Sequence, residues 1–336
     1  MFNKRKIIMI LIIAVVLIFL IFLYFKYSAK TYPKNGFEIS ENFFGLTYSK
    51  KFATELGLDW KEAHQQIIDD LEVKYIRLPI YWEDVEKNQG VYDFSDYDYL
   101  ISEGKKNNVN YIINLGYRLP RWPECHFPKW LDIKNKEELE YKLLNYLKLS
   151  VNHFKNHSNV LYWQIENEPY LGSFGICPKL DKELFNKEIE LVKSLDDRKI
   201  IVSASGELST WHREKRKADI FATTLYRVVH NPYFGFFKYP LPASFYSIKA
   251  KATGIDPKSS LIIELQAEPW VPSGTLADIE EFEYNKSFDL EQFKANAYFA
   301  TKTNFKQAYL WGAEWWYLQK IKGNERYWEF AKTLFK

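Results

Sequence analysis

Two glutamates beside apolar segments are the residues of this 336-residue chain best placed for paired acid–base chemistry. Glu168 closes residues 163–169 (WQIENEP), and Glu264 interrupts the apolar run 261–265 (LIIEL). Two carboxyl groups about 5 to 5.5 Å apart can cleave a glycosidic bond with retention of configuration. One is protonated and donates to the leaving oxygen, while the other is ionised and attacks the anomeric carbon. The sequence predicts Glu168 as the acid/base and Glu264 as the nucleophile.

The triplet Asn167-Glu168-Pro169 ends an apolar strand with a carboxamide and a carboxyl group. Pro169 cannot donate to a strand ladder, so pairing stops there. Simple alternation along a strand puts Glu166 and Glu168 on one face and Asn167 on the other. A catalytic role therefore requires a local twist or bulge that turns Asn167 and Glu168 to the same side. The alternative is a strand-ending turn with solvated acids.

A second acid competes with Glu264 for the role of nucleophile. Glu268 lies four residues later and, like Glu168, precedes a proline. A nucleophile must be held rigidly, and a strand holds a side chain better than a loop does. We therefore favour Glu264 and keep Glu268 as the alternative.

Strand-like and helix-like segments alternate along the chain from about residue 41. The predicted strands are almost wholly apolar, as expected where both faces of a parallel sheet are buried. Eight strand–helix units predict a (β/α)8 barrel. An open doubly wound sheet is the competitor, but the first strand is followed by SKKF and not by a glycine-rich turn. The predicted strands are 44–48, 74–80, 110–115, 160–165, 199–204, 220–226, 261–265 and 308–311, and the helices between and after them are 60–71, 97–106, 136–154, 180–195, 244–252, 290–303 and 325–334.

Long irregular segments follow the third, sixth and seventh strands, at residues 116–132, 227–242 and 266–289. Barrel enzymes build their active sites from loops at these strand ends. Trp122 and Trp130 of the first segment are candidates for stacking on sugars, although each is as well explained by packing. The two cysteines, Cys125 and Cys177, either form a disulfide beside Glu168 or are two free buried thiols.

Taken together, residues 40–336 resemble the clan A retaining glycoside hydrolases, the cellulase-type barrels. The resemblance rests on Asn167-Glu168-Pro169 and Glu264, at the ends of strands four and seven. It implies that Asn167 binds the sugar 2-hydroxyl, that Arg77 and Tyr226 bond the nucleophile, and that Trp311 forms the floor of the −1 subsite. An arginine near Glu264 would stabilise its ionised form, while an apolar site would raise the pKa of Glu168.

The sequence departs from the best-known cellulase-type pattern after strand three. Residues 114–118 (NLGYR) lack the histidine that those enzymes often carry near this point. Asn114 is a candidate sugar ligand in its place. For Arg77 the alternative is a structural salt bridge within the barrel, and for Tyr226 and Trp311 it is ordinary packing in the core.

Composition narrows the class of protein further. The chain carries 46 basic and 43 acidic residues, a formal charge of +3, whereas nucleic-acid binders usually show a strong basic excess. The six histidines form neither an HExxH motif nor a Cys/His cluster, so we expect no zinc site. Double displacement by two glutamates implies no metal or organic cofactor. Aromatic residues make up 18% of the chain, with 11 Trp and 24 Tyr, which suits both a large core and sugar binding.

The N-terminus predicts a membrane anchor in residues 1–25, followed by a linker in 26–40 and the catalytic domain in 41–336. Lys4, Arg5 and Lys6 precede the apolar residues 7–25. At about 1.5 Å per residue such a helix spans roughly 28 Å, close to the thickness of a bilayer core. A cleaved secretory signal is the alternative, but its apolar region is usually shorter. We expect the catalytic domain on the extracytoplasmic side.

The function predicted from the sequence is hydrolysis of a β-linked oligo- or polysaccharide by double displacement. One alternative is a catalytically inactive, membrane-displayed carbohydrate-binding protein, and another is transglycosylation on the same frame. The sugar, the linkage, exo or endo action and the oligomeric state stay open, because enzymes that share this frame differ in loop details.

Overall fold

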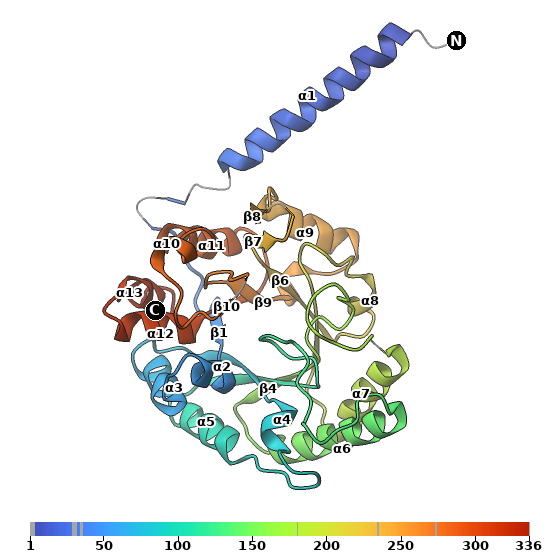
Figure 1. The fold of residues 1–336 in the computed structure, drawn as a ribbon, viewed down its shortest axis with the longest axis vertical. Helices are drawn as coiled ribbons and strands as arrows, with labels where there is room; N and C mark the ends of the chain where they lie inside the picture. The colour runs from blue at the N-terminus through green and yellow to red at the C-terminus, as the bar shows by residue number, and fades with distance from the viewer. Residues whose placement is uncertain are drawn as a thin grey trace.

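Eight parallel strands close into a barrel in the computed structural model, which describes residues 4–28, 32–33, 36–179, 181–233, 235–272 and 274–335 (Figure 1). The order around the barrel is β1-β10-β9-β6-β5-β4-β3-β2. The predicted (β/α)8 fold is confirmed, with every strand within two residues of its predicted bounds. The strands are β1 (Phe44–Thr47), β2 (Tyr75–Pro79), β3 (Asn110–Leu115), β4 (Val160–Ile165), β5 (Ile200–Ala204), β6 (Ile220–Leu225), β9 (Leu261–Gln266) and β10 (Gln307–Trp311).

Helices surround the barrel, and several begin where a side chain caps the first turn. Asp59, Asn135, Asp181 and Asp289 each accept hydrogen bonds from backbone N–H groups at a helix start. The helices are α2 (Lys50–Glu55), α3 (Trp60–Asp69), α4 (Trp82–Val85), α5 (Ser95–Lys106), α6 (Lys136–Phe154), α7 (Lys182–Leu195), α8 (His212–Lys215), α9 (Ala243–Ala252), α10 (Glu281–Tyr284), α11 (Leu290–Thr301), α12 (Ala313–Ile321) and α13 (Arg326–Lys332), with a 3-10 turn at Pro257–Ser259.

The inner face of the barrel carries a layer of apolar side chains below a layer of polar ones. Ile112, Ile201 and Ala222 belong to one buried cluster. Two residues further along their strands lie Asn114, Ser203 and Thr224, which are also buried. Because side chains two apart in a strand share a face, the apolar layer supports the polar one. The polar layer stands at the carboxyl ends of the strands, where barrel enzymes carry their active sites.

Besides short helices such as α2, α4 and α10, a hairpin and a longer helix were not predicted from the sequence. The irregular segment after β6 contains an antiparallel hairpin, β7 (Val228–Asn231) with β8 (Gly235–Lys238). The segment after β10 contains helix α12. Each hairpin strand has only four residues and is mostly half-buried, which is too short for a clear alternation. Helix α12 is buried on almost all sides, so it lacks the polar face that marks a surface helix.

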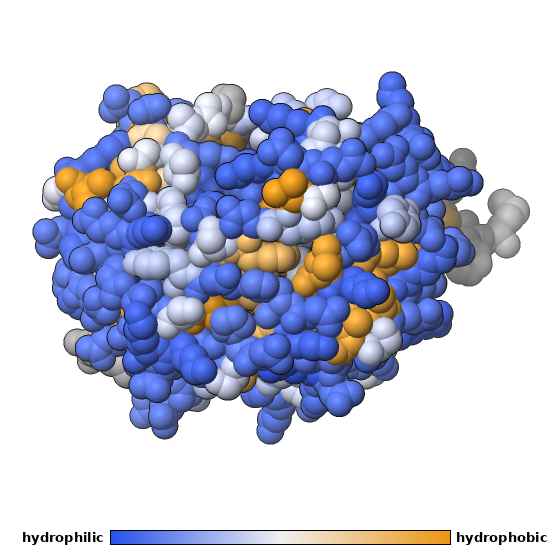
Figure 2. Space-filling view, turned by 90° about the horizontal axis from the view of Figure 1, so that it is seen from below, coloured by the Kyte–Doolittle hydropathy of each residue, from blue (hydrophilic) through white to orange (hydrophobic). Residues whose placement is uncertain are grey.

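At the N-terminus, helix α1 (Lys4–Ser28) projects away from the barrel (Figure 1). Among the described residues, no helix combines the length and the apolar character needed to cross a membrane. The predicted anchor is therefore not confirmed. The predicted linker, 26–40, lies partly outside the described residues. Figure 2 views the barrel from the side opposite α1 and shows a mostly hydrophilic surface with small, separate apolar patches.

Candidate active site

Glu264 lies in β9 and is held by two side chains from other strands. Arg77 of β2 donates from Nη1 to Glu264 Oε1 at 2.6 Å, and Tyr226, just after β6, donates its hydroxyl to Glu264 Oε2 at 2.9 Å. Arg77 is fully buried and Glu264 is 3% exposed. Charge-assisted hydrogen bonds of this kind are shorter and stronger than those between neutral groups. Both contacts are the ones that the resemblance implied.

Arg77 also orders the polar layer around it. Its Nε donates to Gln164 Oε1 at 2.8 Å, and its Nη2 donates to Asn114 Oδ1 at 3.0 Å and to Asn167 Oδ1 at 2.8 Å. Asn114 in turn donates from Nδ2 to the backbone oxygen of Gln164 at 3.2 Å. Asn114 is fully buried and both of its polar atoms are used within the protein. The structure therefore places this predicted sugar ligand beneath Arg77 as part of its support.

The backbone after β4 departs from a regular strand at residues 166–168, where a catalytic role of Glu168 requires a local twist or bulge. Glu166 and Glu168 have φ angles of 57° and 44°, in the left-handed region that non-glycine residues rarely adopt. This turn brings Asn167 and Glu168 to the same side, so simple alternation does not apply. The Glu166 carboxylate accepts from the backbone N–H groups of Tyr117 (3.1 Å) and Arg118 (2.6 Å), and Glu168 N donates to Ser203 Oγ at 2.9 Å. These buried bonds hold the strained backbone in place.

Thr224 of β6 connects the two candidate catalytic acids. Its Cα is paired with that of Glu264 in the neighbouring strand, and its hydroxyl donates to Glu168 Oε1 at 3.1 Å. Burial, and after it the charge of Glu264, raise the pKa of Glu168 to about 8. Glu168 is therefore protonated at neutral pH, in the state that a general acid requires. The two carboxyl groups thus differ in environment, as the sequence analysis expected.

Glu268 belongs to a different cluster. Its carboxylate is paired with Arg121, which also donates from Nη2 to Glu314 Oε2 at 3.1 Å. The Arg121 guanidinium lies 3.9 Å from the centre of the Trp311 ring. One face of Trp311, the predicted subsite floor, is therefore covered by a cation. Burial raises the pKa of Glu268, and Arg121 only partly offsets this.

Aromatic rings connect the surface with Glu264. Trp122 is 60% exposed and packs edge-on against Phe174, with ring centres 6.0 Å apart. Phe174 contacts Trp270 at 5.7 Å, and Trp270 contacts Tyr226 at 5.6 Å. We call these four rings the aromatic row. Trp130 lies outside it, since its ring packs on Trp82 and its indole N–H donates to Glu86 O at 2.8 Å.

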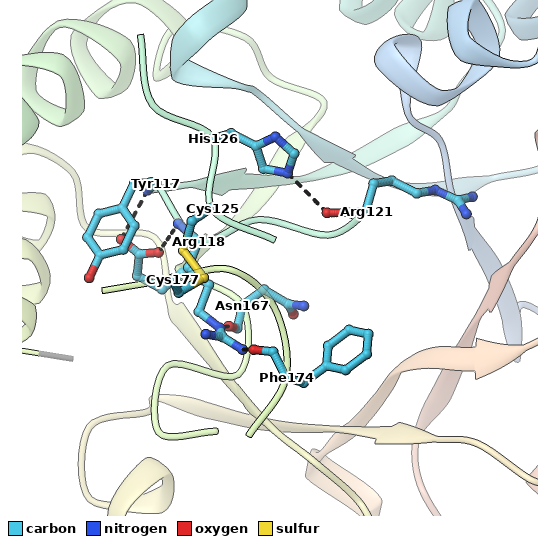
Figure 3. Close-up of a disulfide and its surroundings, with 9 residues drawn as sticks. Tyr117, Arg118, Arg121, Cys125, His126, Asn167, Phe174 and Cys177 are labelled. Carbon is cyan, nitrogen blue, oxygen red and sulfur yellow. Dashed lines mark hydrogen bonds between the residues drawn. A yellow bond between two sulfur atoms is a disulfide. The ribbon is translucent and has the colours of Figure 1, made fainter. Parts of the chain in front are cut away.

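A disulfide joins the loops after β3 and β4. Cys125 and Cys177 are bonded, so the alternative of two free thiols does not hold in this structure. Figure 3 shows the disulfide beside Arg118, whose side chain donates to the backbone oxygens of Asn167 and Phe174, each at 2.9 Å. The disulfide and Arg118 together fix the loops on both sides of Glu168.

Several residues at the site were not predicted from the sequence. Arg118, Arg121 and Glu124 lie in the loop after β3, where no periodic pattern shows which side chains turn inward. Ser203 and Thr224 look like ordinary strand residues. Glu207, after β5, accepts from the Tyr246 hydroxyl and from Tyr226 N (3.3 Å), and burial raises its pKa to about 7. Within the described residues, no group of three or more His, Cys, Asp or Glu side chains is arranged to hold a metal ion.

The chain matches no protein-family model and no curated protein, but its fold is similar to that of solved glycoside hydrolases. Xylanase 10B from Thermotoga petrophila has a TM-score of 0.54 at 16% identity, over 82% of this chain and 86% of that one. A β-galactosidase from Rahnella sp. R3 has a TM-score of 0.54 at 12% identity, over 83% and 51%. A variant of Gan42B, a GH42 β-galactosidase from G. stearothermophilus, has a TM-score of 0.53 at 10% identity, over 82% and 51%.

The chain spans about half the length of the β-galactosidases that it matches. At these identities the similarity is one of fold. The resemblance to the cellulase-type barrels, inferred from sequence, is confirmed at that level.

Proposed function

We propose that this protein hydrolyses a β-glycosidic bond with retention of configuration, using Glu264 as nucleophile and Glu168 as acid/base. The observation that carries the proposal is the contrast between the two acids, both of which contact Thr224: Glu168 through a hydrogen bond and Glu264 through strand pairing. Glu264 is ion-paired with Arg77 and bonded by Tyr226, whereas burial keeps Glu168 protonated. The solved structures of similar fold are named as β-galactosidases and a xylanase, which supports the same class of reaction.

In the first step the Glu264 carboxylate attacks the anomeric carbon and the bond to the leaving oxygen breaks. Glu168 transfers its proton to that oxygen, so the leaving group departs as a neutral alcohol and Glu168 becomes a carboxylate. Glu264 loses its negative charge when its carboxylate forms the ester bond. The pKa of Glu168 then falls, because the neighbouring negative charge that helped to raise it is gone.

In the second step the Glu168 carboxylate takes a proton from a water molecule, which attacks the anomeric carbon. The ester bond to Glu264 breaks, and both carboxyl groups return to their starting states. Arg77 and Tyr226 stabilise the Glu264 carboxylate as it is released. Two inversions at one carbon give net retention.

For the substrate we propose a β-linked oligosaccharide or polysaccharide. The aromatic row leads from exposed Trp122 to Tyr226 beside Glu264. Sugar rings have flat apolar faces that pack on aromatic side chains, as other apolar surfaces do. Several rings in sequence suit a chain of sugars better than a single one.

We further propose that α1 anchors the protein in a membrane with the barrel on the extracytoplasmic side. Residues 7–25 are all apolar, and the described side chains from Ile7 to Leu20 are nearly all exposed. Disulfides such as Cys125–Cys177 persist in oxidising compartments. Full-length protein should sediment with membranes, and protease added to intact cells or spheroplasts should release the barrel. Recovery of the full-length protein in the soluble fraction would contradict the anchor.

The catalytic proposal is tested by trapping the covalent intermediate. An aryl 2-deoxy-2-fluoro-β-glycoside should label the protein once, and peptide mass spectrometry should place the label on Glu264. A label on Glu268 would transfer the role of nucleophile to that residue. In parallel, Glu168→Ala and Glu264→Ala should each lower kcat/KM by at least about 10³-fold on a phenyl β-glycoside, whose poor leaving group needs the proton of Glu168. Near-native turnover by either variant, or a product of inverted configuration by NMR, would overturn the mechanism.

A further inference from the structure

Glu124 is a third carboxyl group at the candidate active site, and the mechanism above does not use it. It lies in the loop after β3, next to Cys125, and is 7% exposed. Its Oε2 has no hydrogen-bond partner among the described residues. A buried polar atom without a partner is rare, because leaving it unpaired costs about 1–3 kcal/mol. Such an atom beside a reaction centre is suited to a ligand.

The surrounding backbone holds Glu124 firmly. Its N–H donates to Arg121 O at 2.7 Å, and its carbonyl oxygen accepts from Leu119 N at 2.8 Å. The disulfide at Cys125 ties the same loop to the segment after β4. From that segment Gly175 approaches so closely that a Cβ on it would lie 2.7 Å from the Cβ of Glu124. Only glycine leaves room for Glu124 at this point.

Asn167 and the two catalytic acids are the neighbours of the Glu124 carboxyl group. The charges of Glu264 and Glu168 raise the pKa of Glu124, and the side chain of Asn167 lowers it, so all three groups lie near the Glu124 carboxyl group. The Asn167 oxygen already accepts from Arg77 at 2.8 Å and from Ser203 at 3.2 Å. The group of Asn167 that faces Glu124 is therefore its Nδ2, which has two hydrogens. Neither hydrogen is used by Arg77 or Ser203, so this group can donate to a substrate.

We propose that Glu124 binds, together with Asn167, the hydroxyl group on C2 of the sugar whose bond is cleaved. This proposal rests on the proposed function and adds a substrate-binding residue to it. The hydroxyl oxygen accepts from Asn167 Nδ2, and the hydroxyl hydrogen is donated to Glu124 Oε2. Glu124 Oε2 and Asn167 Nδ2 are then both hydrogen-bonded to one hydroxyl group of the substrate. Burial raises the pKa of Glu124 well above its ordinary value, so it adds no second negative charge beside Glu264.

The test compares two substrates with the same leaving group: an aryl β-glycoside that the wild-type protein hydrolyses, and its 2-deoxy analogue. Glu124→Ala should lower kcat/KM on the parent glycoside by about 10- to 100-fold, the range expected for one or two lost hydrogen bonds. On the 2-deoxy analogue the loss should be under about threefold, because the partner hydroxyl is already missing. Glu124→Gln, which keeps an acceptor oxygen, should recover most of the activity on the parent.

Controls separate binding from folding. Glu86→Gln alters another buried acid, one that bonds Trp82 and Gly90 in the loop before α5, and should leave both substrates unaffected. If Glu124→Ala does not fold, Glu124→Asp, which withdraws the carboxyl group by one methylene, should show the same selective loss.

Equal losses on both substrates, or no loss on the parent, would overturn the role of Glu124 while leaving the glycosidase proposal intact. If the wild-type protein hydrolyses no β-glycoside and is not labelled by the fluoro-glycoside, both proposals fail.

Discussion

Arg77 and Glu264 form an ion pair at 2.6 Å although their strands, β2 and β9, are not neighbours in the barrel. The pair crosses the interior, and Arg77 also fixes Gln164, Asn114 and Asn167. A single cation thus aligns side chains from three strands and the turn after β4. Removing it would leave Glu264 charged, buried and short of a partner.

Arg77→Met should therefore lower the free energy of unfolding by about 3–5 kcal/mol, the usual cost of breaking a buried ion pair from one side. It should also reduce kcat/KM on an aryl β-glycoside by at least about 100-fold, because the nucleophile loses its alignment. Denaturant unfolding and steady-state kinetics measure the two effects. Arg326→Met, which removes an exposed ion pair with Glu281, is the control and should change neither. An active, fully stable Arg77→Met protein would contradict the assignment.

Tyr226→Phe removes one hydrogen bond, of 2.9 Å, to the Glu264 carboxylate. Burial, followed by the charge of Glu264, raises the pKa of Tyr226 well above its ordinary value, so the hydroxyl keeps its proton as a donor. A hydrogen bond to a charged group contributes about 1.5–3 kcal/mol, which corresponds to roughly 10- to 100-fold in rate. We expect kcat to fall by that factor. An unchanged kcat would show that the hydroxyl does not support the nucleophile.

The pH dependence of activity should follow the protonation of Glu168. Its pKa is raised to about 8, and the free enzyme needs the protonated form, so kcat/KM should fall about tenfold per pH unit above pH 8. A dinitrophenyl glycoside has a leaving group that needs no proton, and this alkaline fall should then disappear. The same fall for good and poor leaving groups would assign it to another residue.

The free energy of unfolding should also depend on the protonation of Glu168. Glu168 binds it in the folded state up to about pH 8 but loses it near pH 4.5 in the unfolded chain. The contribution of Glu168 to stability is complete below pH 4.5 and is lost as the pH rises to about 8. In Glu168→Gln, which carries no proton to lose, the free energy of unfolding should fall less steeply with pH over this interval. Equal slopes in the two proteins would argue against the raised pKa.

Cys125 and Cys177 are separated by 52 residues, so their disulfide restricts a long loop in the unfolded chain. Replacing both by serine should lower the free energy of unfolding by about 2–4 kcal/mol. Activity on the parent glycoside should fall as well, since the bonded loop carries Glu124. Alkylation of the native protein should modify no cysteine before reduction and two after it. Two reactive thiols in the native exported protein would refute the disulfide.

The sequence by itself determined the barrel and the placement of the two acids along it. Apolar runs at regular spacing predicted the eight strands, because strands buried on both faces must be apolar throughout. The end of a strand is also visible in sequence, which is how Glu168 and Glu264 were found. The hairpin after β6 and helix α12 were missed, since a four-residue strand and a helix buried on nearly all sides carry no clear period.

Only the tertiary structure decided which side chains meet. Arg121 and Glu268 are 147 residues apart and pair through loops whose backbone follows no repeat. Glu124 turns inward because of local backbone geometry and a glycine in another loop, neither of which leaves a pattern in sequence. Asn114, predicted to bind sugar, accepts a hydrogen bond from Arg77, a contact between strands that its place in the sequence does not reveal. Sequence periodicity reports burial along one element, whereas contacts between loops depend on how distant elements pack.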